Sequence, residues 1–121
     1  MRVLNIEDTM LKHIDIVRAL SWNGITEVDH KKTLREGLEQ LQKEHYDLLV
    51  VDMHFPLEPG AKADPDAGMK AIAALKEQNI NIPVIVCSSD RLRIDEVAGC
   101  VFYNPSRDLN FDFKEILEKL R

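Results

Sequence analysis

The chain has 121 residues, of which 45% are hydrophobic and 31% are charged, and its formal net charge is -5. These values are typical of one soluble globular domain covering residues 1–121, and they argue against the disordered, collagen-like and membrane-spanning classes. An acidic balance without a long basic cluster argues against nucleic acid or a membrane surface as the main partner. The N-terminus lacks the uninterrupted apolar region of a signal peptide, so we expect a cytoplasmic protein.

Short apolar runs of strand length alternate along the chain with amphipathic stretches of helix length, a pattern typical of β/α units around a parallel sheet. Most of the apolar runs are continuous, which is characteristic of strands buried on both faces. The run at 25–30 is more polar and fits a strand near the sheet edge. In chain order, the predicted strands are residues 2–6, 25–30, 47–51, 83–87 and 100–103.

Four long helices are predicted between and after these strands. Thr9 can cap the first helix, which ends at Asn23-Gly24. The stretch that begins at Thr33 has the capping-box pattern and opens the second, the third runs from about 66 to 78, and the last opens at Asp112. The residues expected to face the core are Met10, Ile14, Val17 and Leu20, then Leu34, Leu38 and Leu41, then Met69, Ile72 and Leu75, and finally Phe113, Ile116, Leu117 and Leu120.

The order of elements predicts an α/β fold with a doubly wound, five-stranded parallel sheet, because each helix returns the chain to begin another strand by a right-handed crossover. Between Ser89 and Gly99 there is room for only a short helix. The segment 57–67, LEPGAKADPDA, is rich in Pro, Gly and Asp and is predicted to be a loop. It is either a lid or partner contact beside Asp52, or a tolerated surface insertion.

Polar side chains follow the predicted strands where each one ends, and the carboxyl ends of parallel strands form the edge of a sheet where ligands bind. Three carboxylates drawn together there raise one another's pKa unless a cation neutralises them. Oxygen ligands without His or Cys in metal spacing suit Mg²⁺. For any single acid, the alternative is a helix N-cap or a solvated loop residue. The residues at these strand ends are Glu7, Asp8, Asp52, Ser88, Ser89 and Asn104-Pro105.

Together these features resemble the response regulator receiver domains of two-component signalling, over nearly the whole chain. The matching motifs are the acidic pair Glu7-Asp8, the aspartate Asp52 of VVDMHFP with Pro56 four residues on, IPVIVCSS with its terminal hydroxyl, and a residue-Pro step after the last strand. The resemblance implies a flavodoxin-like sheet with strand order 2-1-3-4-5 and a shortened fourth helix.

The resemblance also implies a site and a reaction. Asp52 would accept a phosphoryl group from a phosphohistidine on a histidine kinase or a phosphotransfer protein. The carboxylate is then the nucleophile, and catalysis is mostly positioning and charge neutralisation. Mg²⁺ would be held by Asp8, Asp52 and the backbone carbonyl of His54, with Glu7 acting through water.

The expected phosphoryl contacts match the family at one position and depart from it at another. Ser88 would hydrogen-bond a phosphoryl oxygen and draw its loop inward, with Ser89 as the neighbouring alternative. Receiver domains typically carry a lysine before the proline that follows the last strand, and here that residue is Asn104, whose amide can still donate. Arg107 or Lys62 could substitute, or each is a solvated surface charge. The family also suggests a cis peptide bond after Asn104.

Three functions are therefore compared. The first is a stand-alone receiver domain, monomeric or weakly dimeric, which catalyses only its own phosphoryl transfer and signals to an unknown downstream protein through protein contacts. The alternative is a pseudo-receiver adaptor that binds partners without phosphorylation. The third is Mg²⁺-dependent phosphoryl transfer on another substrate, as in toprim-type domains, but those domains need an Asp-x-Asp pair and this chain has Asp52-Met53-His54.

Overall fold

The computed structural model describes residues 1–121 and is built around a five-stranded parallel sheet. Its strands are β1 (Arg2–Ile6), β2 (Glu27–Lys31), β3 (Leu48–Val51), β6 (Val84–Ser88) and β7 (Gly99–Phe102). The spatial order β2-β1-β3-β6-β7 places the five predicted strands in the order 2-1-3-4-5. The predicted flavodoxin-like α/β fold is therefore confirmed.

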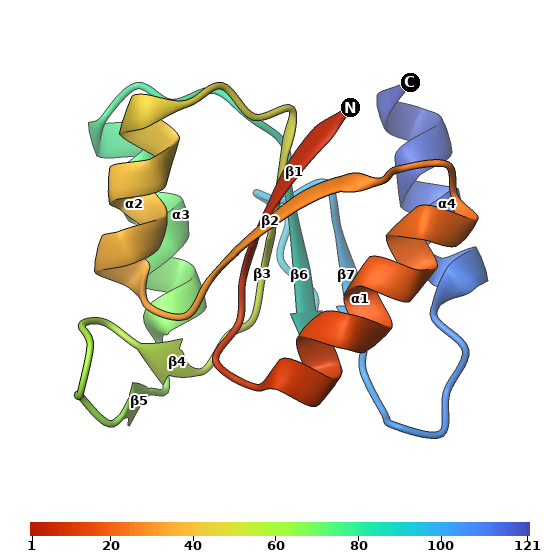
Figure 1. The fold of residues 1–121 in the computed structure, drawn as a ribbon, viewed down its shortest axis with the longest axis horizontal. Helices are drawn as coiled ribbons and strands as arrows, with labels where there is room; N and C mark the ends of the chain where they lie inside the picture. The colour runs from red at the N-terminus through yellow and green to blue at the C-terminus, as the bar shows by residue number, and fades with distance from the viewer.

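Two helices cover each face of this sheet. They are α1 (Met10–Trp22), α2 (Leu34–Lys43), α3 (Ala67–Glu77) and α4 (Asn110–Leu120). Figure 1 shows α1 and α4 together on one face and α2 and α3 on the other, with the carboxyl ends of the strands along a common lower edge. None of the four helices is long and apolar enough to cross a membrane.

The central strands are apolar along their whole length because each fills two layers, one on each face of the sheet. In β1, Leu4 and Ile6 pack on the side of α2 and α3, whereas Val3 packs on the side of α1 and α4. All three side chains are fully buried. Between them lies a buried polar residue, Asn5, whose Nδ2 donates to the backbone oxygen of Val50 at 2.9 Å.

The helix ends follow the capping signals closely. The predicted capping box of α2 is confirmed, because Thr33 Oγ1 accepts a hydrogen bond from the Glu36 amide at 3.2 Å. Thr9 occupies the N-cap position of α1, although its side chain makes no capping hydrogen bond. The last helix begins at Asn110, slightly before the predicted start at Asp112.

Helix α1 is rotated relative to the orientation predicted from its apolar residues. Met10 and Ile14 were expected in the core but are 49% and 38% exposed. Leu20 is buried as expected, and the rest of the buried face is formed by Lys12, Ile16 and Ala19. The prediction assumed that a lysine stays outside, and the structure turns this one inward. In α3 the expected inward residue Met69 is likewise exposed, because the smaller residues Gly68 and Ala71 face the sheet.

The short helix expected between Ser89 and Gly99 is not formed. Residues 89–98 run from β6 to β7 as irregular chain, and alternate apolar side chains among them, such as Leu92 and Ile94, pack against the core on the side of α3. An alternating pattern covers the sheet better in extended chain than in a helix. The expected cis bond after Asn104 is also absent, since every peptide bond is trans.

The insertion at 57–67 is more ordered than the predicted loop. It is bracketed by a two-stranded antiparallel hairpin, β4 (Phe55–Pro56) and β5 (Ala63–Asp64), at the edge of the sheet where the strands end (Figure 1). The amide of Arg35 in α2 donates to the backbone oxygen of Leu57 at 3.0 Å. The insertion is therefore fixed to α2.

The start of α3 lies very close to the end of β3. The amide of Gly68 donates to the backbone oxygen of Met53 at 2.9 Å. A Cβ atom at Gly68 would lie 2.7 Å from the backbone oxygen of Asp52, closer than such atoms approach in proteins. Glycine at this position therefore allows α3 to support the backbone that carries Asp52.

We expect Gly68→Ala to lower the free energy of unfolding by about 1 kcal/mol. The overlap with rigid backbone costs roughly 1–3 kcal/mol, more than the ~1 kcal/mol that alanine gains in helix propensity. Urea denaturation measures the change. Met69→Ala, at the exposed neighbouring position, is the control and should shift stability by under about 0.5 kcal/mol. An unchanged or raised stability for Gly68→Ala would contradict the close packing described here.

Candidate functional site

The carboxylates of Glu7, Asp8 and Asp52 come together at the edge where the strands end, each offering an oxygen within 4.8 Å of the others. Strand register explains their meeting. In the parallel β1–β3 pair, Ile6 lies opposite Val51, so the next residues, Glu7 and Asp52, leave the sheet side by side. The sequence placed these acids at one edge, and the structure brings them within reach of a single cation.

Glu7 is the most buried of the three acids, with 1% of its surface exposed. Its Oε2 accepts a hydrogen bond from the Thr9 amide at 3.0 Å, whereas Oε1 has no hydrogen-bond partner. Burial raises the pKa of Glu7 to about 7, although the ammonium of Lys12 opposes the shift; the negative charge of Asp52 adds to it. A buried carboxylate whose Oε1 has only the Lys12 ammonium beside it, at 3.3 Å, is weakly satisfied by the protein and suits a cation.

Lys12 is the functional residue that the sequence analysis missed. Its side chain is 7% exposed, and its Nζ lies 3.0 Å from Asp52 Oδ1 and 3.3 Å from Glu7 Oε1. The ammonium also lies 5.3 Å from the centre of the Tyr103 ring. Burial works against its charge, but the two carboxylates outweigh burial and raise the pKa of Lys12, so the side chain stays cationic.

A signal for Lys12 was present in the sequence. Lys12, Ile16 and Leu20 are spaced four residues apart and therefore share one helix face. Counting only apolar residues led to a different face. A lysine on the same stripe as buried residues, one turn after an acidic pair, indicates an ion pair beneath the helix.

The net charge of the acid cluster is suited to a divalent cation. When ionised, Glu7, Asp8 and Asp52 carry three negative charges and Lys12 carries one positive charge, which leaves two negative charges. The donors are all carboxylate oxygens, one of them Glu7 Oε1, which makes no hydrogen bond and is contacted only by the Lys12 ammonium, and Asp8 is exposed to solvent. Hard oxygen donors with access to water fit Mg²⁺, which keeps several of its waters when bound.

Asp52 is reachable from outside. Its side chain is 14% exposed. It opens into a cavity of about 440 Å³ at the strand ends. The cavity is lined by Thr9, Leu11, Lys12, Asp15, Asp52, Ser89, Tyr103 and Pro105. None of these belongs to the insertion, so residues 57–67 do not form a lid over Asp52 in this structure.

The two serines after β6 occupy different positions. Ser88 is buried, and its Oγ accepts a hydrogen bond from the Asp90 amide at 3.1 Å. Ser89 is exposed and lines the cavity that contains Asp52. His54, two residues after Asp52, is exposed, and its Nε2 lies 3.8 Å from an Asp90 carboxylate oxygen. The roles assigned to these residues by resemblance stay predictions.

The polar residues considered as replacements for the family lysine point elsewhere. Asn104 is exposed, and its Oδ1 accepts hydrogen bonds from the amide and hydroxyl of Ser106 at 3.0 and 2.8 Å. Arg107 pairs with Asp112 at 2.6 Å. Lys62 lies on the insertion, in a separate hollow. Asn104, Arg107 and Lys62 therefore form no ion pair with the acid cluster.

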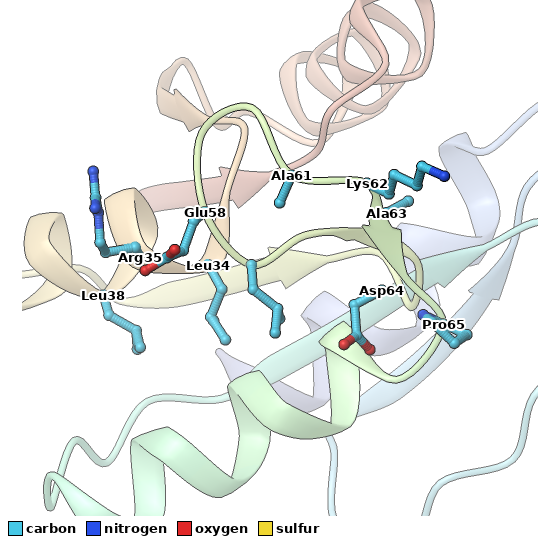
Figure 2. A pocket seen from close by; sticks show the side chains of 10 residues that line it. Leu34, Arg35, Leu38, Glu58, Ala61, Lys62, Ala63, Asp64 and Pro65 are labelled. Carbon is cyan, nitrogen blue, oxygen red and sulfur yellow. The ribbon is translucent and has the colours of Figure 1, made fainter.

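That separate hollow, of about 610 Å³, lies between α2 and the hairpin. Figure 2 shows Leu34 and Leu38 of α2 on one side and Ala61 and Lys62 of the insertion on the other. It shares no lining residue with the cavity at Asp52. It is therefore not part of the acidic site.

A pair of stacked imidazoles supports the backbone beneath the site. The rings of His13 in α1 and His30 in β2 lie 3.7 Å apart and nearly parallel. His30 Nε2 lies 2.6 Å from the backbone oxygen of Glu7, and His13 Nδ1 lies 2.7 Å from Asn5 Oδ1. Burial, with a contribution from His30, lowers the pKa of His13 to about 4. The stack therefore joins α1 to strands β1 and β2 while His13 stays neutral.

Several solved structures that share this fold are response regulators. The response regulator TrrA from Thermotoga maritima, in complex with Mg²⁺-BeF, has a TM-score of 0.76 and 20% identity, covering 99% of this chain and 98% of that chain. The chemotaxis response regulator CheY4 of Vibrio cholerae gives 0.71 and 18%, covering 95% and 97%. HP1043, an orphan response regulator of H. pylori, gives 0.71 and 21%, covering 100% and 97%.

Sequence comparison agrees with the fold. No protein-family model matches the chain. The transcriptional regulatory protein BasR of Escherichia coli is 25% identical over 99 residues, which are 82% of this chain and 40% of BasR. The chain thus spans less than half the length of that relative. The resemblance to receiver domains is confirmed, and the chain has the receiver-domain fold.

We expect Glu7→Gln to stabilise the metal-free protein at pH 8. The pKa of Glu7 is about 7 in the folded state against an ordinary value of 4.5, so the folded state loses stability as the pH rises from 4.5 to 7. Removing the charge should raise the free energy of unfolding by roughly 1–3 kcal/mol at pH 8 and leave it nearly unchanged at about pH 4.

Urea denaturation with a chelator present, at both pH values, measures this difference. Glu58→Gln, which changes an exposed glutamate on the insertion, serves as the control and should show no such pH dependence. A variant that is less stable than the unchanged protein at pH 8 would show that the ion pair with Lys12 outweighs the burial of Glu7.

Proposed function

We propose that this chain, which has the receiver-domain fold, is phosphorylated on Asp52 by a histidine kinase or a phosphotransfer protein and signals through protein contacts. The observation that carries the proposal is the placement of Asp52. Its carboxylate lies at the edge of a rigid sheet, beside two further acids and a buried ammonium, and opens into a cavity. A nucleophilic carboxylate with neutralising partners is what phosphoryl transfer requires.

The free oxygen of Asp52 is the proposed nucleophile. Oδ1 accepts a hydrogen bond from the Met53 amide at 2.7 Å and contacts the Lys12 ammonium, whereas Oδ2 has no protein donor. Oδ2 attacks the phosphorus of the phosphohistidine, and the O–P bond forms as the N–P bond breaks. The bonding pair stays on the imidazole nitrogen, which takes up a proton. The product is an aspartyl phosphate.

Glu7, Asp8, Asp52 and the backbone carbonyl of His54 are the proposed holders of Mg²⁺, with Glu7 acting through water. The ion would neutralise charge on the transferring phosphoryl oxygens. Three observations support this donor set, namely the meeting of the three carboxylates, the lack of a hydrogen bond at Glu7 Oε1 and the residual negative charge of the cluster. The Mg²⁺-BeF complex of TrrA, a protein of the same fold, is consistent with it.

The proposed response uses the hydroxyl that follows β6. Ser88, or its neighbour Ser89 on the cavity wall, would donate to a phosphoryl oxygen and move the irregular chain at 89–98. This surface change would alter contacts with a downstream protein in the cytoplasm. The chemistry is confined to self-catalysed transfer to and from Asp52, in a monomer or weak dimer.

A pseudo-receiver adaptor is the second candidate, and one observation favours it. Lys12 already provides the acid cluster with a protein cation, while Asn104, at the family's lysine position, is turned toward Ser106. A site neutralised in this way would keep the fold and bind partners without phosphorylation. This candidate requires that partner binding be the same for Asp52→Asn and the unchanged protein.

We expect acetyl phosphate with Mg²⁺ to add one phosphoryl group to the protein, because its acetate leaving group departs without a partner enzyme. Intact-mass measurement detects the product, and Asp52→Asn should abolish it since the amide is not a nucleophile. Asp66→Asn, an exposed acid at the start of α3, is the matched control and should be modified normally. If the unchanged protein gains no phosphoryl group under these conditions, the adaptor function is the better one.

A further inference from the structure

We infer that Lys12 is the cationic partner of phosphorylated Asp52, supplied from α1 in place of the lysine that receiver domains carry before the proline after the last strand. The inference rests on the proposed function and names the residue that completes its site. Lys12 lies two residues into α1, whereas the family position is Asn104, after β7. The two positions come from opposite ends of the chain.

The Lys12 ammonium is already in contact with the Asp52 carboxylate, the group that would be phosphorylated. Lys12 Nζ lies 3.0 Å from Asp52 Oδ1, and its side chain is 7% exposed. A lysine is rarely so buried unless it is paired, and here the pairs are Asp52 and Glu7. The ring of Tyr103 lies beside the ammonium, and Tyr103 is itself held by a hydrogen bond from its hydroxyl to Asp15 Oδ2 at 2.6 Å. These contacts fix Nζ at the wall of the cavity.

The family's lysine position adjoins the same cavity. Asn104 is not part of the cavity wall, but Pro105, which follows it, lines the cavity together with Lys12 and Asp52. A long side chain at 104 would therefore start next to the wall that holds Lys12. The other candidates have partners elsewhere, since Asn104 Oδ1 accepts from Ser106 and Arg107 pairs with Asp112.

Phosphorylation strengthens the role of Lys12. The reaction replaces the single negative charge of the Asp52 carboxylate by the roughly two negative charges of a phosphoryl group. Lys12 keeps its proton and exchanges a carboxylate oxygen for a phosphoryl oxygen, so no atom is gained or lost at Nζ. Charge-assisted contacts of this kind are about twice as strong as neutral hydrogen bonds. The new charge therefore pulls on the first turn of α1.

Relocation of the lysine provides the test. The initial rate of phosphoryl addition from acetyl phosphate with Mg²⁺ is measured by intact mass for the unchanged protein, Lys12→Met, Asn104→Lys and the double variant. Loss of one charge-assisted contact in the transition state should slow Lys12→Met by roughly 10- to 100-fold. The double variant should recover most of that rate, because its new lysine stands beside Pro105 at the cavity wall and supplies the lost charge. Asn104→Lys alone should change the rate little.

A second measurement detects the contact between Lys12 and the group bound at Asp52 without any phosphoryl transfer. Beryllofluoride with Mg²⁺ is added to ¹⁵N-labelled protein, and amide shifts are followed in the first turn of α1. The shifts at residues 10–13 should be large in the unchanged protein and small in Lys12→Met. Lys12→Gln, which keeps a polar chain, is the second variant and should show the same loss and the same rescue if Lys12→Met does not fold.

The outcomes separate the inference from the function on which it rests. If the unchanged protein is phosphorylated and Lys12→Met and Lys12→Gln react at its rate, the inference is overturned and the proposed function stands. If the variants are slow but Asn104→Lys restores nothing, Lys12 has only a structural role and the inference is again overturned. If the unchanged protein is never phosphorylated, both the function and the inference fail.

Discussion

The pairing of β1 with β3 is the constraint on which the site depends. The register that sets Ile6 opposite Val51 forces Glu7 and Asp52 out of the sheet side by side, with their charges close together. Such a pair of acids is unfavourable unless something positive lies between them. Lys12 meets that need from α1, and its inward orientation in turn determines which face of α1 is buried. The orientation of α1 therefore determines both the charge compensation of the acids and the packing of the whole helix.

Much of the fold could be predicted because its signals are local. Continuous apolar runs such as the one in DLLVV are typical of strands buried on both faces. The cap from Thr33 to Glu36 depends on only four consecutive residues. The chain at 89–98 was predicted less well. Its alternating apolar residues suit an extended path across a sheet, but that path is chosen by the neighbouring strands and not by the segment itself. The hairpin around the insertion depends in the same way on its attachment to α2.

The candidate site was predictable to the extent that it follows from topology. Any parallel sheet brings its strand ends to one edge, which was enough to place Glu7, Asp8 and Asp52 together. The identity of the cationic partner does not follow from topology. It depends on how far α1 is rotated about its axis, and a rotation of a fraction of a turn decides whether Lys12 faces solvent or Asp52. Apolar periodicity alone selected Met10 and Ile14, because lysine counts as an outward residue in such patterns.

The stack of His13 on His30 has an evolutionary consequence. It ties α1 to the edge strand β2 immediately beside Lys12, and His30 also holds the backbone of Glu7. A substitution that removes either imidazole frees the helix to roll and carries the neighbouring lysine away from the acids. We therefore expect natural variation at position 30, on the outermost strand, to be coupled to variation at positions 12 and 13. In descendants of this chain, these three positions should therefore change together.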